Sequence, residues 1–343
     1  MRVVIVDKAG SYDRLRIEAR PDPTPGPGQV HVKVRAVGVN YADCVVRMGL
    51  YASAREYVGW PIVPGFEVAG EVAALGQGVE GLSEGDPVIA VTRFGGYTTD
   101  LLADRDQVFA LPEGWSFEQG AAFPAVSLTA WFALYELAHP RPGTSALVHS
   151  AAGGVGGALL QMLKLRGCRA VGVVGGPHKV DVALALGAEA VIDKSRQDLW
   201  GEARRLAPEG YGLILDANGA ETLQESYDHL GSPGKLVVYG FHTMLPRQGG
   251  RPSYPRLAVD WLRTPRFNPL NMTNQNRSVL AFNLSYLFDE RHILAESMTW
   301  MLAQVAQGRL RPPPVQTFAF DRVADAHRAL ESGQTVGKLA LIP

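Results

Sequence analysis

The sequence is poor in cysteine. Cys44 and Cys168 are its only two cysteines, and they stand far apart in the chain. A single chain therefore offers neither a disulfide framework nor a cysteine-built zinc site. We interpret both as small buried hydrophobic side chains, which is the common environment of an unpaired cysteine.

The sequence also lacks a charge bias and long apolar runs. Of its 343 residues 20% are charged, and the formal net charge is -1. This balance argues against a nucleic-acid groove or an anionic membrane as partner. No apolar stretch approaches the roughly 20 residues of a membrane span, and we see no basic-then-apolar leader. We expect a cytoplasmic protein with no membrane span, no nucleic-acid partner and a small-molecule substrate.

What the chain does contain is a glycine-rich turn after an apolar run at residues 145–148, followed by a helix-compatible run. This order predicts a buried strand, a tight turn and a helix start that together bind a dinucleotide. Glycine lets the backbone approach a pyrophosphate, and the helix N-terminus supplies N–H groups. The residues assigned to this turn are Ala151, Gly153, Gly154, Val155 and Gly156, with Ala151 where the usual fingerprint has its first glycine.

The two sides of this turn differ in pattern. The first ~120 residues contain short strand candidates separated by proline and glycine turns, which favours a partly open barrel. A helix-like run at 118–137, with Pro124 as a kink or restart, leads into the glycine turn. Strand and helix patterns then alternate up to residue 239, which is typical of a doubly wound parallel sheet. A chain of 343 residues also favours two domains. We predict an α/β protein with a Rossmann domain at 124–287 and a β-rich catalytic domain built from 1–123 and 288–343.

Several segments resemble a known family. They are residues 38–43, 47–51, 64–70, 149–156, 281–287, 321–326 and 336–338. Over its full length the sequence resembles the medium-chain dehydrogenase/reductase superfamily, and within it the zinc-free quinone oxidoreductases and their vesicle amine transport protein homologue subgroup. The resemblance implies a GroES-like fold for the β-rich domain. It also implies a homodimer that pairs through an edge strand near residues 278–283.

Two positions within this resemblance decide the metal chemistry. Zinc alcohol dehydrogenases place a cysteine and a histidine where this chain has Asn40 and Phe66, and their cysteine-rich lobe is missing here. We therefore expect no metal. Without a Lewis acid, nothing lowers the pKa of a bound alcohol, so alcohol oxidation is disfavoured. A hydride can still pass to a quinone or an enone. Asp43 and Glu67 are interpreted as buried structural carboxylates.

The second strand of the alternating region predicts the cofactor. NAD-preferring Rossmann domains place an acid at its end to bind the ribose 2′-hydroxyl. Here Val174 is followed by Gly175, and no acid appears before Asp181. The missing acid and the following Lys179 favour a 2′-phosphate, so we predict NADPH. The resemblance implies that Lys179 contacts this phosphate and makes Lys194 a second candidate.

The nicotinamide end is expected at the carboxyl ends of the later strands, because ligands of open parallel sheets bind there. That rule selects Asn218, Gly240 and Phe241. The resemblance adds Asn283 and Lys338 as cofactor contacts, and it places Asn40 near the nicotinamide.

Tyr51 is the first candidate for the proton donor. Its phenol is protonated at neutral pH, and residues 47–51 resemble the segment of enoyl-thioester reductases that carries their catalytic tyrosine. Two other interpretations remain open: Tyr51 only shapes the pocket, or quinones take their protons from water.

The favoured function is an NADPH-dependent reductase of quinones or α,β-unsaturated carbonyls. The alternatives are an enoyl-thioester reductase and an NADPH-binding interaction protein with little turnover. Residues 245–269 form either a lid or an interaction surface.

Overall fold

The computed structural model describes residues 1–247 and 249–343, which form two compact units. The first unit comprises Met1–Val126, Arg247–Arg251 and Ser285–Pro343, and the second comprises Ser127–Pro246 and Pro252–Leu284. The predicted domain boundaries, 123/124 and 287/288, each lie three residues from a boundary between the units. The catalytic and NADPH-binding roles given to the two domains stay predictions.

The second unit is built on a six-stranded sheet in the order β10-β9-β8-β11-β12-β13, and every neighbouring pair is parallel. Numbered within this sheet the order is 3-2-1-4-5-6, which is that of a doubly wound dinucleotide-binding fold. Strands β9 and β10 are added on one side of β8, and β11 to β13 are added on its other side. The predicted glycine turn, which follows β8, therefore lies at the topological switch point. The strands are β8 (Ser145–Val148), β9 (Arg169–Val174), β10 (Ala190–Asp193), β11 (Tyr211–Asp216), β12 (Leu230–Val238) and β13 (Arg277–Ala281).

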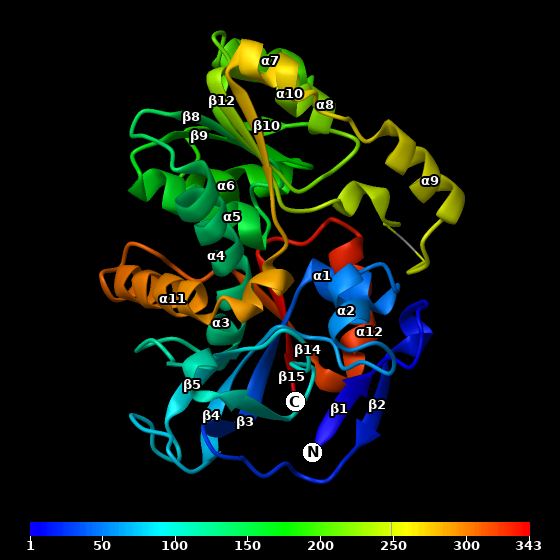
Figure 1. Cartoon of the computed structure of the whole chain (residues 1–343), viewed down its shortest axis with the longest axis vertical. Coiled ribbons are helices and arrows are strands. Elements are labelled where there is room, and N and C mark those ends of the chain that lie inside the picture. Colours follow the sequence, from blue (N-terminus) through cyan, green and yellow to red (C-terminus); the bar gives the residue numbers. More distant parts are fainter. Residues whose placement is uncertain (248) are drawn as a thin grey trace. The chain divides into compact units, whose positions relative to one another are not determined.

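Helices cover both faces of this sheet. Figure 1 shows α5 and α6 on one face and α7, α8 and α10 on the other. The bounds are α5 (Gly154–Leu165), α6 (Val180–Ala185), α7 (Leu199–Leu206), α8 (Leu223–Asp228), α9 (Tyr254–Arg263) and α10 (Pro269–Gln275). A helical run expected at 118–137 with a restart at Pro124 is found as α3 (Phe117–Ala121), α4 (Pro124–Trp131) and a π-helix at Phe132–Ala138. Proline fits the first turn of α4 because its missing N–H would lack an intrahelical partner there.

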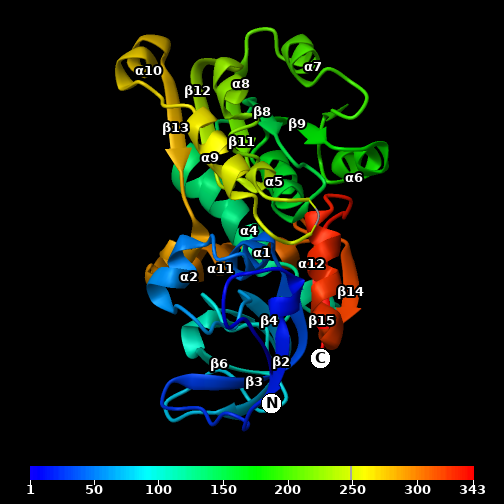
Figure 2. The same cartoon turned by 90° about the vertical axis from the view of Figure 1, so that its right-hand side faces the viewer.

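The first unit contains a seven-stranded sheet in the order β14-β15-β3-β4-β5-β7, with β6 also paired to β3, and a separate β1-β2 pair. All neighbours are antiparallel except β14 and β15. Figure 2 shows α12 beside β14 and β15. The strands are β1 (Arg2–Ile5), β2 (Arg16–Ala19), β3 (Gln29–Val39), β4 (Glu67–Leu75), β5 (Pro87–Val91), β6 (Asp100–Asp104), β7 (Val108–Ala110), β14 (Val315–Ala319) and β15 (Lys338–Ile342).

The helices of this unit are α1 (Tyr41–Arg47), α2 (Ala52–Tyr57), α11 (Arg291–Ala306) and α12 (Val323–Glu331) together with α3. The core beneath them is rich in valine, because the β-branched side chain packs well on a pleated surface. On β3 the alternating residues Val30, Val32 and Val34 are buried in this core. Among the described residues, no helix combines the length and apolar character needed to cross a membrane.

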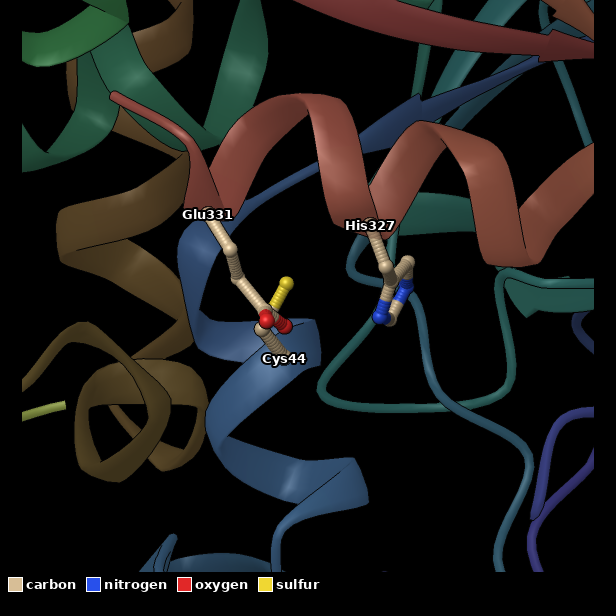
Figure 3. Close-up of side chains that lie close together, drawn as sticks. All are labelled: Cys44, His327 and Glu331. Carbon is tan, nitrogen blue, oxygen red and sulfur yellow. The ribbon is translucent and has the colours of Figure 1, made fainter. Parts of the chain in front are cut away.

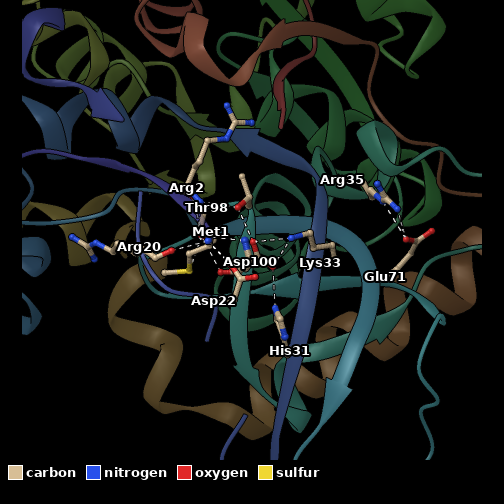
Figure 4. Close-up of polar contacts among 11 residues, drawn as sticks. Met1, Arg2, Arg20, Asp22, His31, Lys33, Arg35, Glu71, Thr98 and Asp100 are labelled. Atoms are coloured by element: carbon tan, nitrogen blue, oxygen red, sulfur yellow. Dashed lines mark hydrogen bonds and ion pairs between the residues drawn. The ribbon is translucent and has the colours of Figure 1, made fainter. Parts of the chain in front are cut away.

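A buried carboxylate joins two strands of this sheet. Asp100 on β6 accepts hydrogen bonds from Lys33 Nζ (2.9 Å) and lies 3.1 Å from His31 Nε2, both on β3 (Figure 4). Burial by itself would raise the pKa of Asp100, yet the hydrogen bonds from Thr99, Lys33 and His31 hold it below its ordinary value. The carboxylate therefore links the side chains of β3 and β6 in addition to the backbone pairing of the two strands.

Candidate functional site

The glycine turn after β8 is built around one close contact. A Cβ on Gly156 would lie 2.3 Å from the carbonyl oxygen of Ser150 and 2.8 Å from Ala151 Cα. Only glycine fits there, because the first turn of α5 packs directly on the preceding backbone. Helix α5 begins at Gly154 with Gly153 as its N-cap residue. The first N–H groups of a helix have no intrahelical partner, so they are available to an anion.

The residue that makes the turn was not singled out from the sequence. Ser150, not Ala151, adopts the left-handed conformation, with a φ of 56°. Ala151 is fully buried, and its N–H donates to Val173 O at 3.0 Å, which links the turn to β9. Serine is uncommon at positive φ, so the residue type gave no signal; the conformation follows from the packing of α5 on β8.

The turn after β11 is organised by the carboxylate of Asp216. One oxygen, Oδ1, accepts the backbone N–H groups of Asn218 (2.7 Å) and Gly219 (3.2 Å). The other, Oδ2, accepts the hydroxyls of Thr222 (2.7 Å) and Ser226 (2.9 Å). Asp216 is fully buried. These four bonds hold the backbone around Asn218, which is itself buried, and no local sequence pattern predicted this role of Asp216.

His149 ties the two turns together. Its Nε2 lies 3.1 Å from Ser226 Oγ. Because the Ser226 hydroxyl donates its one hydrogen to Asp216, the His149 Nε2 must carry the proton and donate to serine. Burial lowers the pKa of His149 below its ordinary value, which favours the neutral ring. The order histidine, serine, aspartate differs from a nucleophilic triad, in which histidine accepts from serine, so we interpret the chain of bonds as structural.

The two candidate 2′-phosphate contacts follow neighbouring strands. Lys179 lies at the end of a short 3-10 helix (Pro177–Lys179) after β9, and Lys194 directly follows β10. The backbone N–H of Lys194 donates to Val174 O at 3.0 Å, so β9 and β10 end side by side. A Cβ on Gly175 would meet nothing within 4 Å. Burial lowers the pKa of the Lys179 ammonium.

The remaining candidates of the second unit follow β12 and β13 at the same edge of the sheet. Gly240 packs against the turn that follows β11, since a Cβ there would lie 2.9 Å from Ala217 O. Phe241 is 48% exposed, which is high for a large aromatic ring. Asn283 follows the end of β13 at Ala281. The structure therefore gathers at one sheet edge the cofactor residues predicted in this unit. Their contact with a cofactor stays a prediction.

Asn40 and Lys338 belong to the first unit, where they share a buried polar cluster. Asn40 precedes α1, and its backbone N–H donates to Asp43 Oδ2 at 2.8 Å. Its side-chain Nδ2 donates to Glu67 Oε1 at 2.8 Å, and its Oδ1 accepts from Lys338 Nζ at 2.6 Å. Asp43 and Glu67 are both fully buried and hydrogen-bonded, as predicted for buried carboxylates. Burial raises the pKa of Asp43 to about 7.

The side chains at the two zinc-ligand positions do not fit a catalytic zinc. The phenyl ring of Phe66 offers no donor atom, and zinc takes nitrogen, sulfur or carboxylate oxygen ligands. Phe66 packs at 5.4 Å from the ring of Phe94 and 6.0 Å from that of Tyr51, measured between centroids. The Asn40 amide is already engaged by Glu67 and Lys338. Tyr51 thus lies in an aromatic cluster, and its catalytic role stays a prediction.

A second group with metal-binding side chains lies between α1 and α12. Cys44, His327 and Glu331 are buried and point toward one another (Figure 3). However, Arg47 Nη2 donates to Glu331 Oε1 at 2.7 Å, and its Nη1 lies 2.9 Å from His327 Nδ1. Burial raises the pKa of the Cys44 thiol well above its ordinary value, so it stays protonated. The guanidinium already supplies the positive charge, and we interpret the group as structural.

Comparison with known proteins gives consistent matches. Residues 26–132 match the family described as alcohol dehydrogenase GroES-like domain, and residues 186–341 match the family described as zinc-binding dehydrogenase. The synaptic vesicle membrane protein VAT-1 homolog of Rattus norvegicus is 33% identical over 345 residues, covering 100% of this chain and 84% of that protein.

Solved structures agree along the whole chain. The quinone oxidoreductase of Escherichia coli in complex with NADPH is 26% identical, with a TM-score of 0.85 and 100% of both chains covered. The CurK enoyl reductase is also 26% identical, with a TM-score of 0.84 and 99% of both chains covered. These neighbours share the GroES-like and Rossmann domains, so the predicted fold class is confirmed.

Proposed function

Because the chain belongs to the medium-chain dehydrogenase/reductase family, we propose that it is an NADPH-dependent oxidoreductase that reduces quinones or α,β-unsaturated carbonyls without zinc. The observation that carries the proposal is the donor set at the zinc-ligand positions, which consists of the engaged amide of Asn40 and the ring of Phe66. Without a Lewis acid, the acceptor must be one whose developing charge is delocalised.

The residues of the second unit fit a dinucleotide. NADPH, when bound, supplies the hydride. The N–H groups at the start of α5 would hold the pyrophosphate, and Lys179 and Lys194 would hold the 2′-phosphate. Asn218, Gly240 and Phe241 would hold the nicotinamide end. The support for these roles is their common place at the carboxyl edge of the parallel sheet.

The first experiment follows NADPH oxidation by absorbance with metal-free protein. The acceptors are ortho-quinones, para-quinones, simple enones and an enoyl thioester, and each active acceptor is tested again with NADH. We expect turnover of quinones or enones with a preference for NADPH. Turnover that requires added zinc would contradict the proposal. Tight NADPH binding with no turnover of any acceptor would support a binding or regulatory role instead.

Lys179→Ala tests the cofactor assignment. We expect the Kd for NADPH to rise about 10-fold, because one charge-assisted contact to the 2′-phosphate is lost. The Kd for NADH should stay within about two-fold, since NADH lacks that phosphate. Fluorescence titration with both cofactors measures the two constants. Lys8→Ala, an exposed lysine of the first unit, is the matched control; an unchanged preference in Lys179→Ala would remove this residue from the phosphate site.

Tyr51→Phe separates the two interpretations of that residue. If Tyr51 donates the proton, kcat for an enone should fall about 100-fold, because a positioned general acid contributes about that factor. Quinone reduction should change little, because the reduced quinone takes protons from water. The ring and its contacts with Phe66 and Phe94 are retained in this variant. Enone turnover at the level of the unchanged protein would show that Tyr51 only shapes the pocket.

An enoyl-thioester reductase is the second candidate function. The similarity to the CurK enoyl reductase over 99% of both chains favours it. Exposed arginines at Arg247, Arg251 and Arg256 would suit the phosphate groups of a thioester carrier. The enoyl thioester in the acceptor panel distinguishes the two functions. Residues 245–269 stay predicted as either a lid or an interaction surface. Residue 248 lies outside the described residues.

We further propose a cytoplasmic homodimer. β13 is the last strand of the parallel sheet and pairs only with β12 among the described strands. An edge strand leaves N–H and C=O groups unpaired, and pairing with a second copy across a two-fold axis satisfies them. Sedimentation equilibrium at micromolar concentration should give twice the mass of 37.0 kDa. A monomer under those conditions would contradict the dimer.

A further inference from the structure

A buried lysine from the last strand has all its hydrogens engaged. Lys338 is 4% exposed, and its Nζ donates to Val39 O (2.7 Å), Asn40 Oδ1 (2.6 Å) and Glu67 Oε1 (2.8 Å). An ammonium has three N–H donors and no acceptor. The three contacts use all of them, and the contact of Lys338 with a cofactor stays a prediction.

These contacts fix which way the Asn40 amide faces. Its Oδ1 lies against the Lys338 ammonium, and its Nδ2 lies 2.8 Å from Glu67 Oε1. The opposite orientation would set an NH₂ group against an ammonium and an oxygen against a carboxylate. The assignment of the two amide atoms therefore follows from the chemistry of their neighbours. Nδ2 carries two hydrogens, and Glu67 takes one of them.

The carboxylate that completes the cluster is itself held in place. Glu67 is fully buried, and its Oε2 accepts the backbone N–H of Ala125 at 2.7 Å. Its charge balances that of Lys338, which makes the burial of both tolerable. The ammonium also polarises the Asn40 amide, because a hydrogen bond from a cation to Oδ1 strengthens donation by Nδ2.

We propose that Lys338 and Glu67 are positioning residues that hold Asn40 so that its remaining Nδ2–H donates to the carbonyl oxygen of the acceptor. The proposal rests on the reductase function proposed above. Hydride addition forms a C–H bond at the β-carbon and breaks the C=C π bond. The electron pair moves to the carbonyl oxygen, which becomes an enolate. Asn40 stabilises that charge by hydrogen bonding and gives up no proton; the proton comes from Tyr51 or water.

The double variant Lys338→Met/Glu67→Gln tests this role. It removes both charges together, so no lone charge stays buried. We expect NADPH to bind within about two-fold of the unchanged protein, while the single-turnover rate of hydride transfer falls about 100-fold, as for loss of one oxyanion donor. Lys33→Met, which removes a half-exposed lysine paired with Asp100, is the matched control and should keep the full rate.

A second measurement does not depend on turnover. Selective ¹⁵N-asparagine labelling reports the side-chain amide of Asn40, and we expect its hydrogens to exchange with water faster in the double variant. If this double variant fails to fold, Lys338→Gln/Glu67→Gln replaces it, because both substituted side chains are polar and no lone charge is buried; its hydride-transfer rate should fall about 10-fold. Unchanged Asn40 exchange, or a full rate in a folded variant, overturns the positioning role. Absence of turnover in the unchanged protein overturns the reductase function instead, and Asn40 exchange still decides the positioning role.

Discussion

Arg47→Met is expected to lower the free energy of unfolding of the first unit by about 3 to 5 kcal/mol, the cost of breaking a buried ion pair from one side. Arg47 is fully buried, and its Nη2 donates to Glu331 Oε1 (2.7 Å) and to Gly250 O (3.1 Å). Methionine fills much of the volume but leaves the Glu331 carboxylate buried without a cation. The side chain of His327 also loses the donor to its Nδ1.

Urea unfolding, followed by fluorescence and by circular dichroism, measures this loss. Arg35→Met is the matched control, because Arg35 pairs with Glu71 at 2.7 Å on the surface (Figure 4). An exposed pair contributes at most about 1 kcal/mol. The double variant Arg47→Met/Glu331→Gln should recover most of the loss, since no lone charge remains. If Arg47→Met costs no more than Arg35→Met, the buried pair does not stabilise the unit as argued.

Gly156→Ala is expected to raise the Kd for NADPH about 100-fold. Its Cβ would lie 2.3 Å from Ser150 O and 2.8 Å from Ala151 Cα, and both of these are backbone atoms that cannot rotate away. The start of α5 must shift, and a misplacement of about 1 Å costs roughly that factor at a positioned site. The N–H groups that would hold the pyrophosphate move with the helix.

Isothermal titration with NADPH measures the effect, and a melting curve shows whether the variant is folded. Gly26→Ala is the control, because a Cβ there meets its first neighbour, Gln29 Oε1, at an ordinary 3.4 Å. We expect this control to bind NADPH as the unchanged protein does. A folded Gly156→Ala protein with the original affinity would show that the turn does not bind the pyrophosphate.

The elements that the sequence predicted well are those with a local cause. The glycine turn after β8 has its signal within about twenty residues, and the restart at Pro124 follows from the missing N–H of proline. The edge position of β13 follows from its place after five alternating strands, and the structure confirms it. Helix α12 was overlooked, because residues 321–326 were considered only as a family motif.

The polar clusters were beyond sequence reasoning for a different reason. Asp43 and Glu67 were recognised as structural carboxylates, but their partners were not named. Lys338 Nζ meets Asn40 across 298 residues of chain, and Arg47 Nη2 meets Glu331 across 284. No local pattern joins residues so far apart. Their pairing depends on β15 lying antiparallel to β3 and on α12 packing against α1.

The sequence by itself determined the fold class, the place of the glycine turn after β8 and the side chains at positions 40 and 66, because residue type and spacing decide each of these. The tertiary structure alone decided what the buried side chains do. In it, Ser150 is the left-handed residue of the turn, and the Asp216 carboxylate accepts the backbone N–H of Asn218. The Lys338 ammonium lies against the Asn40 amide. The physical reason is that a buried polar atom must find a partner wherever the packing of distant segments provides one.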